Sequence, residues 1–194
     1  MSPPSTIQVA DKRITPQLLI ESTPSYCLNT GRGGTGSVLL TVLNNSEVTL
    51  DEMNWYDNSS NSLVGNGSQV FDLYPGYYDV EVVSSEGCPA TATSEIKTEI
   101  LSYNLVSVNT DNRNDVWIID CIDHFPANNV KVFNRTGILV YEANGYDNAE
   151  KVFSGLGEKG VYVSGRTLPD GTYFYIIDKR DGSKPIVGYL ELVR

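Results

Sequence analysis

The sequence contains few of the residues on which catalytic and metal sites depend. Its 194 residues include one histidine, three cysteines and two tryptophans. The single histidine, His124, leaves one candidate base for a Ser-His-Asp triad, and no G-x-S-x-G segment accompanies it. His124 and Cys121 have no zinc-ligand spacing to other candidate ligands. The sequence therefore predicts neither a Ser-His-Asp triad nor a zinc site, while its 24 acidic residues leave a carboxylate pair for glycoside hydrolysis open.

Long apolar runs and excess positive charge are also absent from the sequence. No run of a dozen apolar residues occurs, so we expect no membrane span, and the N-terminus lacks the basic and apolar regions of a signal peptide, so we expect no signal peptide either. The net charge is −10; residues 1–100 carry 12 acidic against 4 basic side chains, and residues 101–194 carry 12 against 10. Such a field repels phosphate backbones, which excludes nucleic acid as a partner.

The apolar residues follow the pattern of an all-β protein. Short segments rich in Val, Ile, Leu, Thr and Tyr alternate with Asn, Gly, Asp, Pro and Ser clusters at intervals of about 8 to 12 residues. No segment has convincing amphipathic helical periodicity, and residues 147–153 are expected to form at most one short turn. The expected strands are 17–21, 37–43, 52–56, 69–73, 76–84, 91–101, 116–119, 129–133, 139–142, 171–177 and 186–193.

The strands divide into two consecutive immunoglobulin-like β-sandwich domains. A polar, Asn- and Asp-rich stretch at 104–114 separates the last strand of one set from the first strand of the next. We expect domains at 16–100 and 101–194, each near the usual size of a small domain, preceded by a flexible arm at 1–15.

The three cysteines are Cys27, Cys88 and Cys121. Cys27 and Cys88 both lie near the ends of expected strands of the first domain, where a disulfide could join the edges of a sandwich in an oxidising compartment. Trp55 lies between them, in the Cys, Trp, Cys order of immunoglobulin domains. Two buried thiols are the alternative, and Cys121 is expected to be an unpaired, buried small residue.

Two polar segments require a choice between a binding role and a structural one. Residues 31–36 match G-x-G-x-x-G, but the segment that follows alternates like a strand, so no helix N-terminus would face a pyrophosphate. Asn109, Asp111 and Asp115 could converge on calcium, although Arg113 replaces an EF-hand ligand. An Asx-rich turn that caps backbone N–H groups is the favoured alternative to this calcium site.

Five segments of the second domain, in order from residue 109 to the last residue, match the motifs of a known family. The matching positions are Asn109, Asp111, Asn114, Asp115, Trp117, Phe133, Asn134, Arg135, Gly137, Tyr146, Gly155, Leu168, Pro169, Gly171, Tyr173, Gly188 and Arg194. By these positions the second domain resembles the gliding-motility-associated C-terminal domain, the type B sorting domain of the Bacteroidetes type IX secretion system.

The sequence departs from this family's pattern at three positions. Thr136 replaces the usual Trp, Phe153 stands where a second Trp precedes Gly155, and Asn112 replaces a glycine. Because Phe153 and the many tyrosines can still fill aromatic volume, we expect a repacked face within the same fold. Arg135 could hold its turn by bonding carbonyls or Asp115, or could form a surface that the export machinery recognises.

Four parts of the first domain also match a known repeat: Cys27, 36–38, the alternating segment 73–82, and 87–92, which includes Cys88. By these parts the first domain resembles the SprB-type repeat, an immunoglobulin-like module of large Bacteroidetes surface adhesins. The resemblance implies an oxidising compartment and therefore favours the pair Cys27 and Cys88.

Together the two resemblances imply the C-terminal part of a longer, secreted, cell-surface gliding adhesin that is not an enzyme. They imply passage through the type IX outer-membrane translocon, a PorP/SprF-like outer-membrane partner, and an extracellular location associated with the outer membrane. An accessible edge strand at the C-terminus would allow docking by strand addition. The alternative is a carbohydrate-binding module, for which the candidate contact residues are Trp55, Tyr56, Tyr74, Tyr77 and Tyr78.

Overall fold

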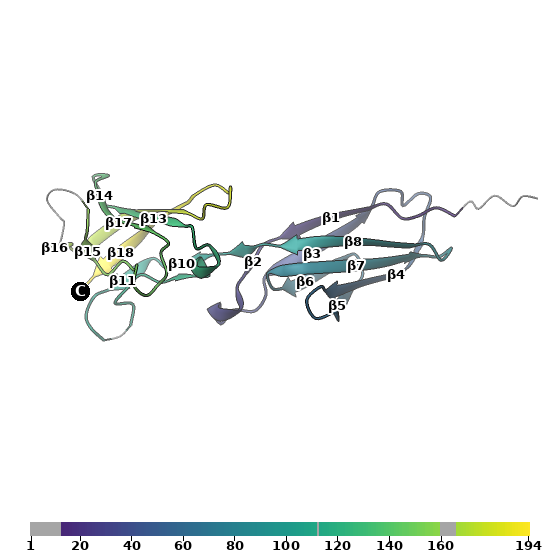
Figure 1. Cartoon of the computed structure of the whole chain (residues 1–194), viewed down its shortest axis with the longest axis horizontal. Coiled ribbons are helices and arrows are strands. Elements are labelled where there is room, and N and C mark those ends of the chain that lie inside the picture. Colours follow the sequence, from purple (N-terminus) through teal and green to yellow (C-terminus); the bar gives the residue numbers. More distant parts are fainter. Residues whose placement is uncertain (1–12, 112, 160–165) are drawn as a thin grey trace, which may run out of the picture. The chain divides into compact units, whose positions relative to one another are not determined.

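The computed structural model describes residues 13–111, 113–159 and 166–194 (Figure 1). Nearly all of its regular structure is β-strand, as the sequence predicts, with two short 3-10 helices at Leu28–Thr30 and Ile122–His124. Contacts divide the chain into two units. The first comprises Gly33–Lys97 and the residues up to Ser25, and the second comprises Thr98–Arg194 together with Tyr26–Arg32. The sequence prediction kept residues 26–32 in the first domain.

The expected arm at 1–15 lies almost entirely outside the described residues. Of its described part, the carbonyl of Thr15 accepts a hydrogen bond from the Asn44 side chain at 3.1 Å.

The first unit packs two antiparallel sheets around one core. One sheet has the order β1 (Leu18–Thr23), β3 (Gly36–Val42), β6 (Gln69–Leu73). The other has the order β5 (Ser62–Asn66), β4 (Leu50–Asp57), β7 (Gly76–Ser84), β8 (Pro89–Ile96). Strand alternation sends one face of each sheet inward. The core residues are Val38, Leu40, Trp55, Val70, Leu73, Tyr78, Val80, Val82 and Ile96.

The second unit is built on a five-stranded sheet. Its order is β11 (Leu105–Ser107), β18 (Ile186–Val193), β17 (Gly171–Asp178), β13 (Asn129–Phe133), β14 (Leu139–Asn144). Three two-stranded sheets are also present among the described residues. They pair β2 (Ser25–Tyr26) with β9 (Thr98–Glu99), β10 (Leu101–Ser102) with β12 (Ile119–Asp120), and β15 (Leu156–Gly157) with β16 (Arg166–Thr167).

The last strand, β18, lies inside this sheet. It pairs antiparallel with β17 along its length, and β11 pairs with it in parallel, with Leu105 opposite Glu191 and Ser107 opposite Val193. The expectation of an accessible C-terminal edge strand is therefore wrong for these last residues, because a three-residue strand that the alternation pattern did not reveal covers them.

The core of the second unit is rich in aromatic side chains. Trp117 stacks obliquely on Tyr175, with ring centroids 4.7 Å apart, and Tyr141 meets Phe153 edge to face at 5.4 Å. Tyr146 contacts both Trp117 and Tyr141 in the same edge-to-face manner. These pairs fill the volume between the sheet and the irregular segments that cover its inner face.

Both units contain the same corner. In each, a buried leucine is followed three residues later by a glycine that begins a strand and five residues later by a buried tyrosine. The Tyr78 hydroxyl donates to the carbonyl of Tyr74 at 3.0 Å, and the Tyr173 hydroxyl donates to the carbonyl of Pro169 at 2.8 Å. This is the tyrosine corner of immunoglobulin-like sandwiches, and it occurs once in each unit.

The predicted disulfide is wrong. Cys27 is bonded to Cys121, with Cα atoms 5.7 Å apart, and Cys88 is a free, half-buried thiol. Cys88 lies in the turn between β7 and β8, where its N–H donates to the Ser84 hydroxyl at 3.0 Å. Cys27 instead belongs to the second unit. There it is bonded to Cys121, the cysteine that the sequence analysis expected to be unpaired.

Some strand boundaries also differ from the prediction. The segment expected as one strand at 91–101 is divided into β8, β9 and β10, and strand structure near Trp117 begins only at Ile119. Residues 147–153 form bends without a helix, because the Asp147 carboxylate accepts the N–H groups of Ala149 and Lys151, both at 2.9 Å.

Candidate functional site

Most of the positions that carried the family resemblance fall into two groups, and the other three, Asp115, Phe133 and Gly188, are half-buried. One group is buried and holds the second unit together: Trp117, Tyr146, Gly155, Leu168 and Tyr173. The other lies at the surface, mostly in loops at the ends of strands: Asn109, Asp111, Asn114, Asn134, Arg135, Gly137, Pro169, Gly171 and Arg194. Asn112, a departure from the family pattern, lies outside the described residues.

The buried group is organised around the Tyr146 hydroxyl. This hydroxyl donates to the carbonyl of Trp117 and accepts the N–H of Phe153 at 3.0 Å. The Trp117 indole donates to the carbonyl of Tyr103 at 2.6 Å. Burial raises the pKa of Tyr146 far above its usual value, so this tyrosine keeps the proton that it donates. The network is therefore structural, and it joins the segments that contain Tyr103, Trp117, Tyr146 and Phe153.

Two asparagines that the sequence analysis did not single out complete this buried network. The fully buried Asn128 donates to the carbonyls of Phe125 and Tyr146 and accepts the N–H of Tyr146. Asn148 accepts the N–H of Ile119 and donates to the carbonyl of the same residue, both at 2.9 Å.

Gly155 occupies a position that favours glycine by its backbone conformation and by its close packing. Its φ is +73°, and a Cβ atom there would lie 2.9 Å from Cδ1 of Leu192 and 3.2 Å from Cγ2 of Val108. The carbonyl of Gly155 accepts the N–H of Leu168 at 2.9 Å. Glycine thus permits the close approach between this segment and the end of β18.

The Asn109–Asp115 loop directs its side-chain oxygens toward its own backbone. The Asp115 carboxylate accepts the N–H groups of Asn109 at 3.1 Å and Thr110 at 2.8 Å. The Asn109 side chain accepts the N–H of Asp111, and Asp111 accepts the N–H of Arg113 at 2.8 Å. These are the contacts of an Asx-rich turn.

A calcium site at Asn109, Asp111 and Asp115 stays a prediction. In the described part of the chain, no group of three or more His, Cys, Asp or Glu side chains is placed to hold a metal ion. The oxygens that would bind calcium are those that accept the loop's own N–H groups, so binding would have to replace hydrogen bonds already made.

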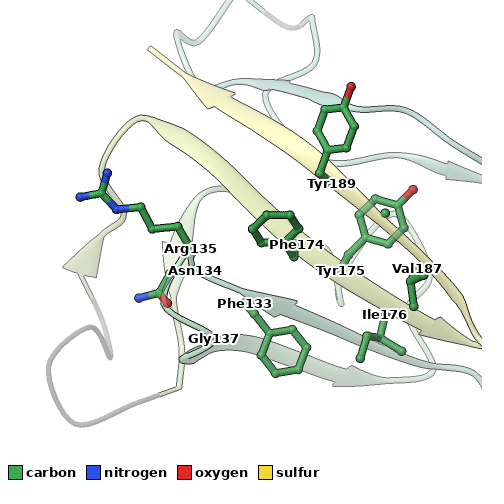
Figure 2. Close-up of a pocket in the computed structure, with 10 residues that line it drawn as sticks. Phe133, Asn134, Arg135, Gly137, Phe174, Tyr175, Ile176, Val187 and Tyr189 are labelled. Atoms are coloured by element: carbon green, nitrogen blue, oxygen red, sulfur yellow. The ribbon is translucent and has the colours of Figure 1, made fainter.

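The turn between β13 and β14 is held by Asn134. Its side-chain oxygen accepts the N–H groups of Thr136 at 3.0 Å and Ile138 at 2.9 Å, and Gly137 has φ +78°. Arg135 is exposed, and within the described residues its guanidinium has no hydrogen bond or ion pair. Asn134 therefore performs the structural role that the sequence analysis considered for Arg135, and Figure 2 shows the guanidinium extended away from the sheet.

Register places four of the five motif segments at one end of the sheet. Phe133, the last residue of β13, lies opposite Phe174 near the start of β17. Gly171, the first residue of β17, lies opposite Leu192 near the end of β18. Ser107, at the end of β11, lies opposite Val193. The Asn109–Asp115 loop, the Asn134–Gly137 turn, the Leu168–Gly171 loop and Arg194 therefore all leave the sheet at this end, which we call the motif end.

The motif end contains a groove and an ion pair. The groove has a volume of ≈ 750 Å³, and its lining includes Arg135, Thr136 and Asp170. Arg194 lies 2.7 Å from the Asp170 carboxylate, which joins the last residue to the loop before β17. Arg135, which lines the same groove, forms no ion pair with an acidic side chain among the described residues.

An apolar surface continues from the motif end along the outer face of the sheet. Phe133, Phe174 and Tyr189 lie in register on three neighbouring strands, with Ile176 and Val187 in the next row (Figure 2). Phe174 and Tyr189 are each about half exposed, at 49% and 50%, and Val187 is 70% exposed. They border a shallow hollow of ≈ 630 Å³ that also reaches Arg135. We call these five apolar residues the outer-face patch.

Sequence reasoning identified only Phe133 of this patch. The signal for the others was nevertheless present, since Tyr173, Tyr175 and Ile177 alternate with Phe174 and Ile176. If Tyr173, Tyr175 and Ile177 face the core, Phe174 and Ile176 must face outward. A strand that is apolar on both faces indicates that its outer face is an interaction surface.

The residues proposed for carbohydrate binding are divided between the core and the surface of the first unit. Trp55 and Tyr78 are buried, and the Trp55 indole donates to the carbonyl of Gly67 at 3.1 Å. Tyr77 is 56% exposed and Tyr56 is half-buried, on the outer face of the sheet that contains β4 and β7. Tyr74 is also half-buried, and its carbonyl belongs to the corner already described.

No helix among the described residues is both long and apolar enough to cross a membrane.

One comparison with known proteins gives a match within the second unit. Residues 100–192 match the model of the CHU_C type IX secretion signal domain. This match supports a secreted protein that is sorted by the type IX secretion system and that interacts with the machinery of that system. The matched range covers all of the motif segments except Arg194.

The remaining comparisons give only distant similarities. No curated protein matches the chain. Among solved structures, three N-terminal domains of the bacteriophage RB49 Highly Immunogenic Outer Capsid protein are 10% identical over 92% of this chain and 69% of that one, with a TM-score of 0.32. Dimeric latent PorU from Porphyromonas gingivalis is 9% identical over 99% of this chain and 21% of that one, with a TM-score of 0.28. Neither similarity supports a conclusion about function.

Proposed function

We propose that this chain is the C-terminal part of a secreted, cell-surface gliding adhesin, without enzymatic activity. In this proposal the second unit is a type B signal for type IX secretion and surface attachment, and the first unit is a SprB-type repeat of the adhesive stalk. The match of residues 100–192 to a type IX secretion signal domain is the observation that carries the proposal. The partners would be the outer-membrane translocon and a PorP/SprF-like outer-membrane protein, with no nucleic acid involved.

The motif end and the outer-face patch form the surface that we propose the export machinery recognises. Buried motif residues fix the fold, so recognition has to use the exposed ones, and these converge on one end of the sheet. Half-exposed aromatic rings supply apolar contact area, and the unpaired guanidinium of Arg135 supplies a charge for a carboxylate of the partner.

The whole chain, placed behind a signal peptide and a fluorescent reporter, tests the proposal in a host with a type IX system and the cognate partner. We expect reporter on the cell surface, where external protease removes it. Fluorescence retained in the periplasm, in a host that exports its own cargo normally, would contradict the proposal.

Substitution of Arg135 by alanine tests the recognition surface. We expect surface delivery to fall several-fold, while the folded fraction stays the same because Arg135 is exposed and holds nothing in place. Lys184→Ala is the matched control. It removes one exposed positive charge from the loop that precedes β18, at the end of that strand opposite the motif end. Equal delivery of the two variants would exclude Arg135 from recognition.

A carbohydrate-binding role for the first unit is the second candidate. It is favoured by the positions of Tyr56 and Tyr77: Tyr56 lies opposite Asp79, and Tyr77 lies two residues before Asp79 on the same face of β7. Two neighbouring tyrosine rings beside a carboxylate can stack on a sugar and accept its hydroxyl hydrogens. Binding of the whole chain to a glycan array, lost in a Tyr56→Ala, Tyr77→Ala double variant, would support this role; absence of any bound glycan would exclude it.

A further inference from the structure

The second unit is not built from one continuous stretch of chain. Residues Tyr26–Arg32, which we call the strap, belong to the second unit, whereas the chain before and after them belongs to the first. The strap lies outside the range that matches the secretion signal domain, which begins only at residue 100.

The strap is anchored in the core of the second unit. Cys27 is 2% exposed, belongs to the same apolar cluster as Ile100 and Ile119, and is bonded to the equally buried Cys121. The Cys27 N–H also points at the sulfur of Cys121, at 3.2 Å. A side chain of residue 27 is therefore part of a core whose other members follow residue 97.

The strap also has a defined local structure. The Thr30 hydroxyl donates to the carbonyl of Cys27 at 3.1 Å and accepts the N–H of Arg32 at 3.1 Å. Gly31 reverses the chain with φ +69°, and the Arg32 guanidinium lies 5.4 Å from the centre of the Tyr26 ring. These contacts make the segment a compact loop that presents Cys27 to the core.

The far end of the disulfide adjoins the buried motif residues. Cys121 directly follows β12, whose residue Asp120 accepts the Tyr103 hydroxyl at 2.6 Å. The carbonyl of Tyr103 in turn accepts the indole N–H of Trp117. Fixing Cys121 therefore restrains the segment that positions Trp117, the largest aromatic side chain of this core.

We propose that the secretion signal of this chain is discontinuous: the strap and its disulfide complete the folded signal that residues 100–192 form only in part. The inference rests on the proposed function and adds a requirement to it. The two thiols each give up one proton and one electron to a disulfide oxidant, which is reduced to a dithiol. The signal is then complete only after the chain reaches an oxidising compartment.

A thermodynamic test uses the fact that each unit contains one tryptophan. In full-length Trp55→Phe protein, the fluorescence of Trp117 reports the second unit, and in Trp117→Phe protein the fluorescence of Trp55 reports the first. Both carry Cys88→Ser, so that Cys27 and Cys121 are the only remaining cysteines. With a thiol reductant, we expect the urea midpoint reported by Trp117 to fall by about 1 M, and that reported by Trp55 to stay unchanged. An unchanged Trp117 midpoint would overturn the inference.

Export of the whole chain provides the second test. We expect a Cys27→Ser, Cys121→Ser variant to reach the cell surface several-fold less than a Cys88→Ser variant, which keeps the disulfide. If the unaltered chain is not exported, the proposed function fails, while the urea experiment still decides whether the strap completes the unit. If the unaltered chain and the double variant are exported equally, the proposed function stands and the requirement for the strap is refuted.

Discussion

At the scale of single residues, Gly188 shows how an absent side chain maintains a core. A Cβ atom at this position would lie 2.3 Å from the hydroxyl oxygen and 2.5 Å from Cζ of Tyr175. The Tyr175 ring cannot move aside freely, because it stacks on Trp117 and its hydroxyl shares a 2.8 Å hydrogen bond with Ser102. The glycine at position 188 of β18 is therefore explained by packing within the second unit, independently of any partner.

We expect Gly188→Ala to destabilise the second unit by about 1–3 kcal/mol, the usual cost of forcing an extra group into a packed site. The measurement is the urea midpoint of Trp117 fluorescence in the full-length Trp55→Phe protein. Gly33→Ala is the control, since nothing lies within 4 Å of a Cβ atom built there. A Gly188→Ala protein as stable as the unaltered chain would show that Tyr175 can relax.

Individual residues were also where the sequence was least informative. Trp117 and Tyr146 could be recognised as motif positions, but the sequence does not show that one hydroxyl joins them to Phe153. Asn128 and Asn148 gave no signal, since a buried asparagine differs from a turn asparagine only in its distant partners. Hydrogen bonds between segments far apart in sequence are set by the fold, and local patterns do not encode them.

At the scale of elements, the tyrosine corners are the clearest shared feature of the two units. In both, the hydroxyl of a buried tyrosine bonds the carbonyl four residues earlier, across the glycine that starts a strand. The bond fixes the path by which the chain enters β7 and β17, the strands that carry much of each core.

We expect Tyr78→Phe and Tyr173→Phe each to destabilise its own unit by about 1 kcal/mol, since each removes one hydrogen bond and leaves a carbonyl unpaired. Trp55 fluorescence should register only the first substitution and Trp117 fluorescence only the second. The converse pattern, or no effect from either change, would show that the corner contributes little. Tyr77→Phe, at an exposed ring, is the control.

Alternation predicted the long strands well and the short ones poorly. The bounds of β7, β13 and β18 are those expected from the sequence, because each buries alternate apolar residues over five or more positions. β11 was missed because a three-residue strand has no period to detect. Because β11 was not predicted, β18 was taken for an edge strand of the sheet. One missed short strand therefore led to the expectation that a partner docks on β18 by strand addition.

At the scale of the whole molecule, the disulfide was predicted wrongly because each domain was assumed to be one continuous stretch of sequence. Cys27 and Cys88 bracket Trp55 in the order of an immunoglobulin domain, and this order favoured the wrong pair. The order of cysteines along a chain says nothing about a segment that leaves one unit to join another, as residues 26–32 do. The fold class needed only local patterns, whereas the pairing needed the three-dimensional arrangement.

The two units should also differ in their response to alkaline pH. Burial raises the pKa of Tyr141 and Tyr146 in the second unit well above the usual value, and it also raises the pKa of Tyr173. In the first unit, burial raises the pKa of Tyr78. A raised folded-state pKa means that the folded chain keeps protons that the unfolded chain releases above about pH 10. The corresponding stability is complete below that pH and declines as the pH rises further.

Because more of these tyrosines lie in the second unit, we expect its urea midpoint to fall more steeply between pH 9 and 11 than that of the first. Trp117 and Trp55 fluorescence in the two single-tryptophan proteins measure the two slopes. Cys88→Ser belongs in both, since exchange of the free Cys88 thiol with the Cys27–Cys121 disulfide would add a second cause of instability. Tyr146→Phe should make the Trp117 slope shallower, because it removes one of the protons at issue. Equal slopes for the two units would mean that alkaline instability comes from general charge repulsion in this acidic chain, without a specific contribution from the aromatic core.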